Sequence, residues 1–101
     1  MIRNVVVGVV RPGVTPEQVE RALTALRDLR LDGVPPGIAG IVAGQDLGLR
    51  EGNASYCLTV DFPDEAAYRA YDLDEEHNRI RRELFAPISA SIQRIQFALP
   101  D

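Results

Sequence analysis

The sequence has one cysteine, one histidine and no tryptophan, and its basic residues are all arginine. A lone Cys57 excludes an intramolecular disulfide and argues against a zinc site built from thiolates. Because Cys57 stands in an apolar, strand-like stretch, we expect it to be a small buried side chain. No stretch approaches the roughly 18 continuous apolar residues of a membrane span, so we expect no membrane partner.

The charge balance is acidic, with 11 basic and 15 acidic residues, a net charge of −4 and a pI near 4.9. Phosphate backbones need a basic face, so nucleic acid is not an expected partner. With 101 residues, 46% hydrophobic and 26% charged, the chain predicts one globular domain over residues 1–101. A domain this small buries a limited core, which favours association with a second copy.

The N-terminal residues Met1–Val5 lead directly into a strand-like run. They lack the charged region, apolar region and cleavage site of a signal peptide. The expected location is therefore the cytoplasm.

Hydrophobic periodicity and turn residues divide the chain into four strands and three helical pieces. A capping box formed by Thr15 and Gln18, with Pro16 at the first helical position, starts a helix that should run to about Leu31. The predicted loops are Asp32–Gly37 and Gln45–Asn53, the predicted strands are Ile2–Val10, Ile38–Ala43, Tyr56–Phe62 and Ser91–Phe97, and the later helices begin after Asp64 and at Asp74 or Glu75. The order β-α-β-β-α-α-β predicts an α+β, ferredoxin-like fold with a four-stranded antiparallel sheet.

The first strand is apolar on both sides. Strand alternation puts Val5, Val7 and Val9 on one face and Asn4, Val6 and Gly8 on the other. Helices can cover only one face, so we expect a second subunit to cover the other. The predicted assembly is a symmetric homodimer.

Several polar clusters lack the spacing of a defined site. The carboxylates around Asp72–Glu76 lack the spacing of a calcium loop and are expected to be solvated helix caps. The segment Gly44–Gly48 lacks the Lys-Ser/Thr and the helix of a phosphate-binding loop. The arginines at 79, 81 and 82 are expected to form a solvated face. We expect neither a metal nor another cofactor.

His77 is the main candidate for chemistry, because its ordinary pKa is close to neutrality. It could act as a general base, contact a ligand, or be a half-exposed helix-start residue that is satisfied locally. Tyr68 and Tyr71 lie three residues apart on one helix face. Gly8 in mid-strand marks a close approach, a bulge or an opening that would deepen a pocket beside Asn4 and Val6.

The chain resembles the stress-responsive A/B barrel, or Dabb, family along essentially its whole length. The stretches that carry the resemblance are Met1–Val6, Arg11–Val19, Gly44–Gly48, Asp61–Tyr71, His77, Pro87 and the last strand through Phe97. The resemblance implies a dimeric α/β barrel. It says less about function, because the family includes a plant polyketide cyclase, stress-associated proteins and many bacterial proteins of unknown role.

In cyclase-type members the resemblance implies a pocket with two histidines and a tyrosine. Tyr71 matches the tyrosine, and His77 matches the histidine that acts as general base. Asn4 stands where the other histidine would be; it can form hydrogen bonds but cannot carry a proton. We expect Asn4, Tyr71 and His77 to converge on one cavity with Val6 and Gly8 as its floor.

Three functions remain open. The first is a cofactor-free, cyclase-like or lyase-like enzyme in which His77 removes a proton beside the carbonyl of a small apolar or aromatic ligand. The second is a non-catalytic, stress-associated or ligand-binding dimer. The third is a cofactor-free monooxygenase.

Overall fold

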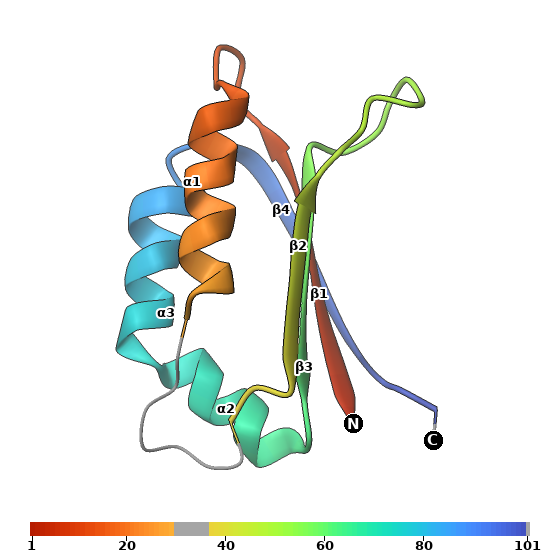
Figure 1. Cartoon of the computed structure of the whole chain (residues 1–101), viewed down its shortest axis with the longest axis vertical. Helices are drawn as coiled ribbons and strands as arrows, with labels where there is room; N and C mark the ends of the chain where they lie inside the picture. The colour runs from red at the N-terminus through yellow and green to blue at the C-terminus, as the bar shows by residue number, and fades with distance from the viewer. Residues whose placement is uncertain (30–36, 101) are drawn as a thin grey trace.

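The chain folds into a four-stranded antiparallel sheet with its helices on one face, as the computed structural model of residues 1–29 and 37–100 shows (Figure 1). The elements in order are β1 (Ile2–Val10), α1 (Pro16–Arg27), β2 (Gly40–Gln45), β3 (Tyr56–Phe62), α2 (Glu65–Leu73), α3 (Glu75–Ile80), the π-helical turn η1 (Arg81–Phe85) and β4 (Ser89–Ala98). The strand order is β2-β3-β1-β4. This is the ferredoxin-like α+β arrangement, which confirms the predicted fold class.

The helix starts are determined locally. The Thr15 hydroxyl accepts from the Gln18 amide, and the Gln18 side chain accepts from the Thr15 amide, which completes the predicted capping box of α1. Asp64 caps α2 in a similar way by accepting from the Ala67 amide. Helix α1 ends at Arg27 rather than near Leu31, because the Asp28 and Leu29 amides close its last turn.

Two strands have bounds that differ from the predictions. β2 covers Gly40–Gln45 instead of Ile38–Ala43, and β4 covers Ser89–Ala98 instead of Ser91–Phe97. Their partners determine these bounds, since β2 pairs along β3 and β4 pairs along β1. The predicted loop at Asp32–Gly37 lies outside the described residues except for Gly37. Within those described residues, no helix is both long enough and apolar enough to cross a membrane.

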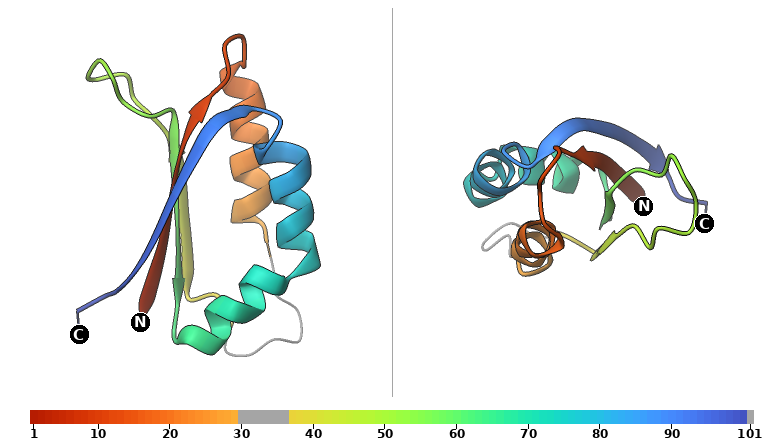
Figure 2. Two further views of the ribbon diagram at one scale, coloured as in Figure 1. Left: turned by 180° about the vertical axis from the view of Figure 1, so that it is seen from behind. Right: turned by 90° about the horizontal axis from the view of Figure 1, so that it is seen from above.

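The helices lie over one face of the sheet (Figure 2), and the buried side chains of the core come from that face and from the helices. Alternate side chains of β1 and β3 point into the core, and the buried stripe of α1 packs against them. Its most buried large side chains include Tyr56, Phe62, Leu23, Ile80 and Val60. Buried side chains of α2 and α3 therefore pack against side chains from the helix-facing side of the sheet.

In the part of the chain that the structure describes, the opposite face of the sheet carries no helix (Figure 2). Val42 is 71% exposed and Ile95 is 61% exposed on this helix-free face. Cys57, which pairs in register with Val7, is also exposed there, so the expectation of a buried cysteine is wrong for the single chain. The reason is strand parity, which turns Tyr56 and Leu58 toward the helices and Cys57 away from them.

Gly8 lies against the ring of Tyr56. A Cβ atom at position 8 would lie 2.1 Å from the Tyr56 Cζ atom. The ring has little freedom to move, because its hydroxyl hydrogen-bonds Ser89 Oγ at 2.7 Å and the ring packs at a tilt against Phe85 with the centroids 5.5 Å apart. Gly8 thus marks a close approach between β1 and a core tyrosine, and not an opening.

We predict that Gly8→Ala lowers the free energy of unfolding by about 1–3 kcal/mol, because the methyl group overpacks the core against Tyr56. The measurement is urea denaturation of both proteins. Gly40→Ala is the matched control, since a Cβ atom at Gly40 has no neighbour within 4 Å among residues 1–29 and 37–100. Its unfolding free energy should change by about 0.5 kcal/mol or less. Equal stability of the Gly8→Ala variant and the parent would contradict the close-approach interpretation.

Candidate active site

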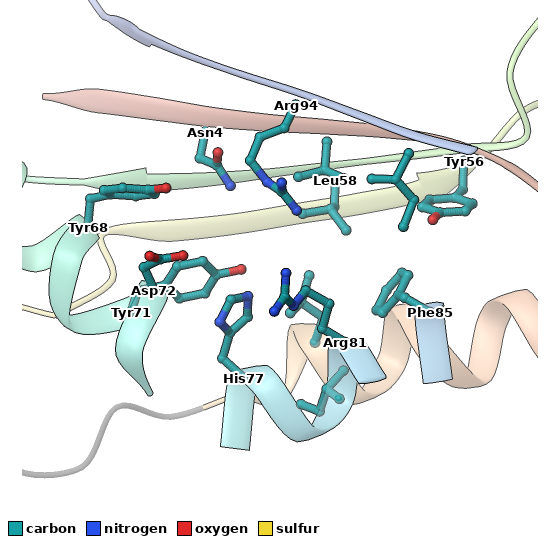
Figure 3. Close-up of a pocket in the computed structure, with 14 residues that line it drawn as sticks. Asn4, Tyr56, Leu58, Tyr68, Tyr71, Asp72, His77, Arg81, Phe85 and Arg94 are labelled. Carbon is teal, nitrogen blue, oxygen red and sulfur yellow. The ribbon is translucent and has the colours of Figure 1, made fainter. Parts of the chain in front are cut away.

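A cavity of about 90 Å³ lies between the helix-facing side of the sheet and the helices α2, α3 and η1 (Figure 3). Both the sheet and the helices contribute polar side chains to its lining. The polar and ionisable groups on which the site depends are Asn4, Arg94, Tyr71, Asp72, His77 and Arg81. Apolar side chains such as Val6, Leu58 and Ile80 complete the wall.

Asn4 is 2% exposed and is held from the neighbouring strand. Gln96, its register partner on β4, donates a hydrogen bond from Nε2 to Asn4 Oδ1 at 2.7 Å. The amide nitrogen of Asn4 points into the cavity (Figure 3). The pair thus places a hydrogen-bond donor at the sheet side of the site, and Gln96 orients it.

Tyr71 comes from α2 and is buried between two rings. Its ring centroid lies 5.0 Å from that of Phe62 and 3.8 Å from that of the His77 imidazole, with 31° between the latter two planes. Burial raises the pKa of the Tyr71 hydroxyl well above its ordinary value. Tyr71 therefore stays protonated at neutral pH and can donate a hydrogen bond.

His77 lies in the first turn of α3, where its backbone N–H donates to Asp74 Oδ2 at 2.9 Å. Its Nδ1 atom is buried and has no hydrogen-bond partner among residues 1–29 and 37–100. The backbone N–H of His77 is thus satisfied locally, whereas Nδ1 is not, and the imidazole points into the cavity beside Tyr71 (Figure 3).

The environment of His77 favours the uncharged imidazole. Burial lowers its pKa below the ordinary 6.5, and the nearby Arg81 guanidinium lowers it further. The backbone of Tyr71 and the carboxylates of Asp72 and Asp74 act in the opposite direction but do not reverse the shift. At neutral pH the ring is uncharged and able to accept a proton.

Two arginines complete the site, and the sequence did not indicate either. Arg81 was expected in a solvated face with its neighbours, but it lines the cavity, whereas Arg79 pairs with Glu76 and Glu83. Arg94 enters from β4 on the face shared with Asn4 (Figure 3). Strand alternation in β4 is the signal that could have placed Arg94 there.

The structure brings four of the five predicted site residues to one cavity: Asn4, Val6, Tyr71 and His77. Gly8 is the fifth and does not line it, because the Tyr56 ring occupies the space above its backbone. The prediction that Gly8 deepens the pocket is therefore wrong.

No group of three or more His, Cys, Asp or Glu residues in the described part of the chain could hold a metal ion. In the acidic segment, Asp74 caps α3 and Glu76 pairs with Arg79.

Comparisons with known proteins agree with the fold. The sequence profile described as the stress responsive A/B barrel domain, Dabb, matches residues 2–98. A dimeric ferredoxin-like protein of unknown function from Thermobifida fusca is 31% identical, with a TM-score of 0.82 over 97% of this chain and 90% of that chain. The comparison with curated protein sequences finds no match.

More distant structures share the fold alone. A protein from Arabidopsis thaliana is 17% identical, with a TM-score of 0.80 over 100% of this chain and 97% of its own. The hydroxynitrile lyase from Passiflora edulis is 15% identical, with a TM-score of 0.79 over 99% of this chain and 94% of its own. Taken with the profile match over residues 2–98, these findings show that the chain belongs to the stress responsive A/B barrel domain (Dabb) family.

Proposed function

We propose that this protein is a homodimeric, cofactor-independent enzyme in which His77 acts as general base on a small carbonyl-bearing compound. The observation that carries the proposal is the buried imidazole, which has no partner for Nδ1 among the described residues and a pKa below its ordinary value. A base that is uncharged at neutral pH and faces a cavity can remove a proton from a bound molecule.

The proposed step is removal of a proton from the carbon next to the carbonyl. The C–H bond breaks, the proton moves to His77, and the electron pair moves onto the carbonyl oxygen as an enolate. We propose that the Tyr71 hydroxyl and the Asn4 amide donate hydrogen bonds to that oxygen, because both side chains line the cavity. The enolate carbon can then attack a second carbonyl, as in an aldol-type cyclisation, and the oxygen of that carbonyl then takes the proton from His77. Alternatively, the enolate carbon recovers the proton from His77.

The cavity limits what can react. At about 90 Å³ it accepts a small compound or the reacting end of a larger one, since engineered cavities of roughly 150 Å³ hold one benzene. The name of the Passiflora edulis neighbour, a hydroxynitrile lyase, supports an enzymatic use of this fold.

The small volume also supports a second candidate, a dimer that binds a ligand without transforming it. Much of the space between sheet and helices is filled by the rings of Tyr56, Tyr71 and Phe85. Proton transfer to solvent separates the two candidates, because binding alone does not exchange carbon-bound hydrogen.

The dimer is proposed to form through the helix-free faces of two sheets. This face carries a hollow of about 470 Å³, with Val7, Val42 and Cys57 in its lining. Leu47 and Leu49 of the β2–β3 loop also line it, and they are 81% and 84% exposed. The Thermobifida fusca relative is dimeric. We place the dimer in the cytoplasm, where a lone thiol stays reduced.

We predict a mass in light scattering of twice the 11.1 kDa of one chain. Val7→Glu should give a monomeric or unfolded protein, because the carboxylate would lose its solvation inside the interface. Leu73→Glu is the matched control: Leu73 is 80% exposed on α2, away from this face, so its variant should remain dimeric. A parent protein with the mass of one chain would contradict the dimer.

Cys57 provides a second readout of the same interface. Its thiol is exposed in the single chain, so pairing of the helix-free faces should make it react slowly with a thiol reagent. A folded Val7→Glu monomer should react faster than the parent. Equal rates would mean that the dimer, if present, uses another surface.

The catalytic prediction uses exchange of the α-hydrogens of 2-butanone and 2-oxobutanoate in D₂O, followed by NMR. The protein should accelerate exchange, and the rate should rise with pH through the pKa of His77 and then level off, because only the uncharged ring is a base. His77→Gln should lower the rate by about 10²–10⁴-fold.

Arg82→Gln is the control for this experiment. Arg82 is exposed and does not line the cavity, so its variant should keep the parent rate. Exchange that survives His77→Gln would refute the role of His77. A parent that accelerates exchange of neither compound would favour the ligand-binding dimer.

A further inference from the structure

Arg81 and Arg94 approach the same cavity from opposite sides, one from η1 and the other from β4 (Figure 3). Neither guanidinium forms an ion pair or a hydrogen bond with any residue in 1–29 or 37–100. By contrast, Arg3, Arg27, Arg69 and Arg79 each have a carboxylate partner. Arg21, Arg50 and Arg82 also have no carboxylate partner among the described residues, but they lie outside the cavity. Arg81 and Arg94 are the two arginines that line it, and neither has a counter-charge in an ion pair.

An acidic protein gains nothing in stability from placing two unpaired guanidiniums together, since like charges repel. Carboxylate side chains are available, because the chain has 15 of them against 11 arginines. The arrangement is explained if a bound anion supplies the missing counter-charge. Guanidinium groups present paired donors that match the two oxygens of a carboxylate.

The other charges around the cavity indicate the charge of that anion. Asp72 also lines it and contributes one negative charge, and His77 is uncharged at neutral pH. Two guanidiniums against one carboxylate leave one positive charge. That balance suits a monoanion better than a phosphate monoester, which carries close to two charges at neutral pH.

We propose that Arg81 and Arg94 bind a carboxylate group of the ligand, so that the substrate class is a small oxo acid. The carboxylate is inferred from the arginines alone. The carbonyl group of the ligand is inferred from the proposed function, and that part of the inference rests on it. With the carboxylate on the arginines, the neighbouring carbonyl lies toward Tyr71 and Asn4 and the acidic C–H toward His77. The apolar wall, which includes Ile80 and Ile92, then receives the hydrocarbon part.

The test compares isobutyrate with isobutyramide, an uncharged molecule of nearly the same shape, and with methyl phosphate at constant ionic strength. Binding is measured by calorimetry on the dimeric protein. NMR of the imidazole resonances locates the site, because His77 is the chain's one histidine. Isobutyrate should bind at least about tenfold more tightly than isobutyramide and should shift those resonances.

Substitution identifies the groups responsible. Arg94→Gln and Arg81→Gln should each weaken isobutyrate binding by about tenfold or more and leave isobutyramide unchanged. Arg82→Gln is the matched control and should bind isobutyrate as the parent does. Equal binding of acid and amide, tighter binding of methyl phosphate, unmoved His77 resonances, or no saturable isobutyrate binding would each overturn the proposal.

The same variants separate this inference from the proposed function. If isobutyrate binds as predicted but no α-hydrogen exchange occurs, the carboxylate site is supported and the catalytic role of His77 is refuted. If 2-butanone exchanges as fast as 2-oxobutanoate and Arg94→Gln changes neither rate, the role of His77 as base is supported and the carboxylate site is refuted.

Discussion

The central strand β1 lies between β3 and β4 and pairs with both from Ile2 to Gly8, so its side chains there have only the two faces of the sheet available. Alternation along one strand assigns each residue to the cavity side or to the helix-free side. Asn4 and Val6 are therefore committed to the cavity by the same register that commits Val5 and Val7 to the opposite face. A slip of one residue would exchange these roles, so the site and the proposed dimer surface depend on one register.

The cavity combines two opposing physical demands. Burial keeps Tyr71 protonated and His77 uncharged, which gives the site one donor and one base at neutral pH. Arg81 and Arg94 add positive charge at the same place, and Arg81 reinforces the effect of burial on His77. A bound anion would relieve the repulsion between the arginines. An empty and an occupied cavity therefore differ in electrostatics as well as in volume.

Local rules were sufficient for much of the fold. The Thr15 capping box and the alternation in β1 involve residues close in sequence, and both could be read directly. The packing at Gly8 could not be predicted from the sequence. A mid-strand glycine indicates a close approach but does not identify the residue that approaches, and Tyr56 is distant in sequence. The error on Cys57 has a related origin: an apolar strand does not reveal which of its faces the helices cover.

The site residues could be predicted from the sequence where the family resemblance supplied matching positions. Residues that reach the cavity only through the packing of helices and strands could not be predicted. Tyr71 and His77 came from matched positions, but their stacked rings depend on the break between α2 and α3. Arg81 reaches the cavity from the start of a π-helical turn, and no sequence pattern predicted that turn. Arg94 required knowledge of the register between β1 and β4.

The proposed chemistry requires an uncharged imidazole at His77 in the folded protein. An NMR titration of that imidazole in the ligand-free protein gives its pKa without interference, since no other histidine contributes a signal. We expect a midpoint below 6.5, the ordinary value, because burial and Arg81 both disfavour the charged ring. A midpoint above 6.5 would show that the folded protein stabilises the imidazolium and would refute the uncharged base.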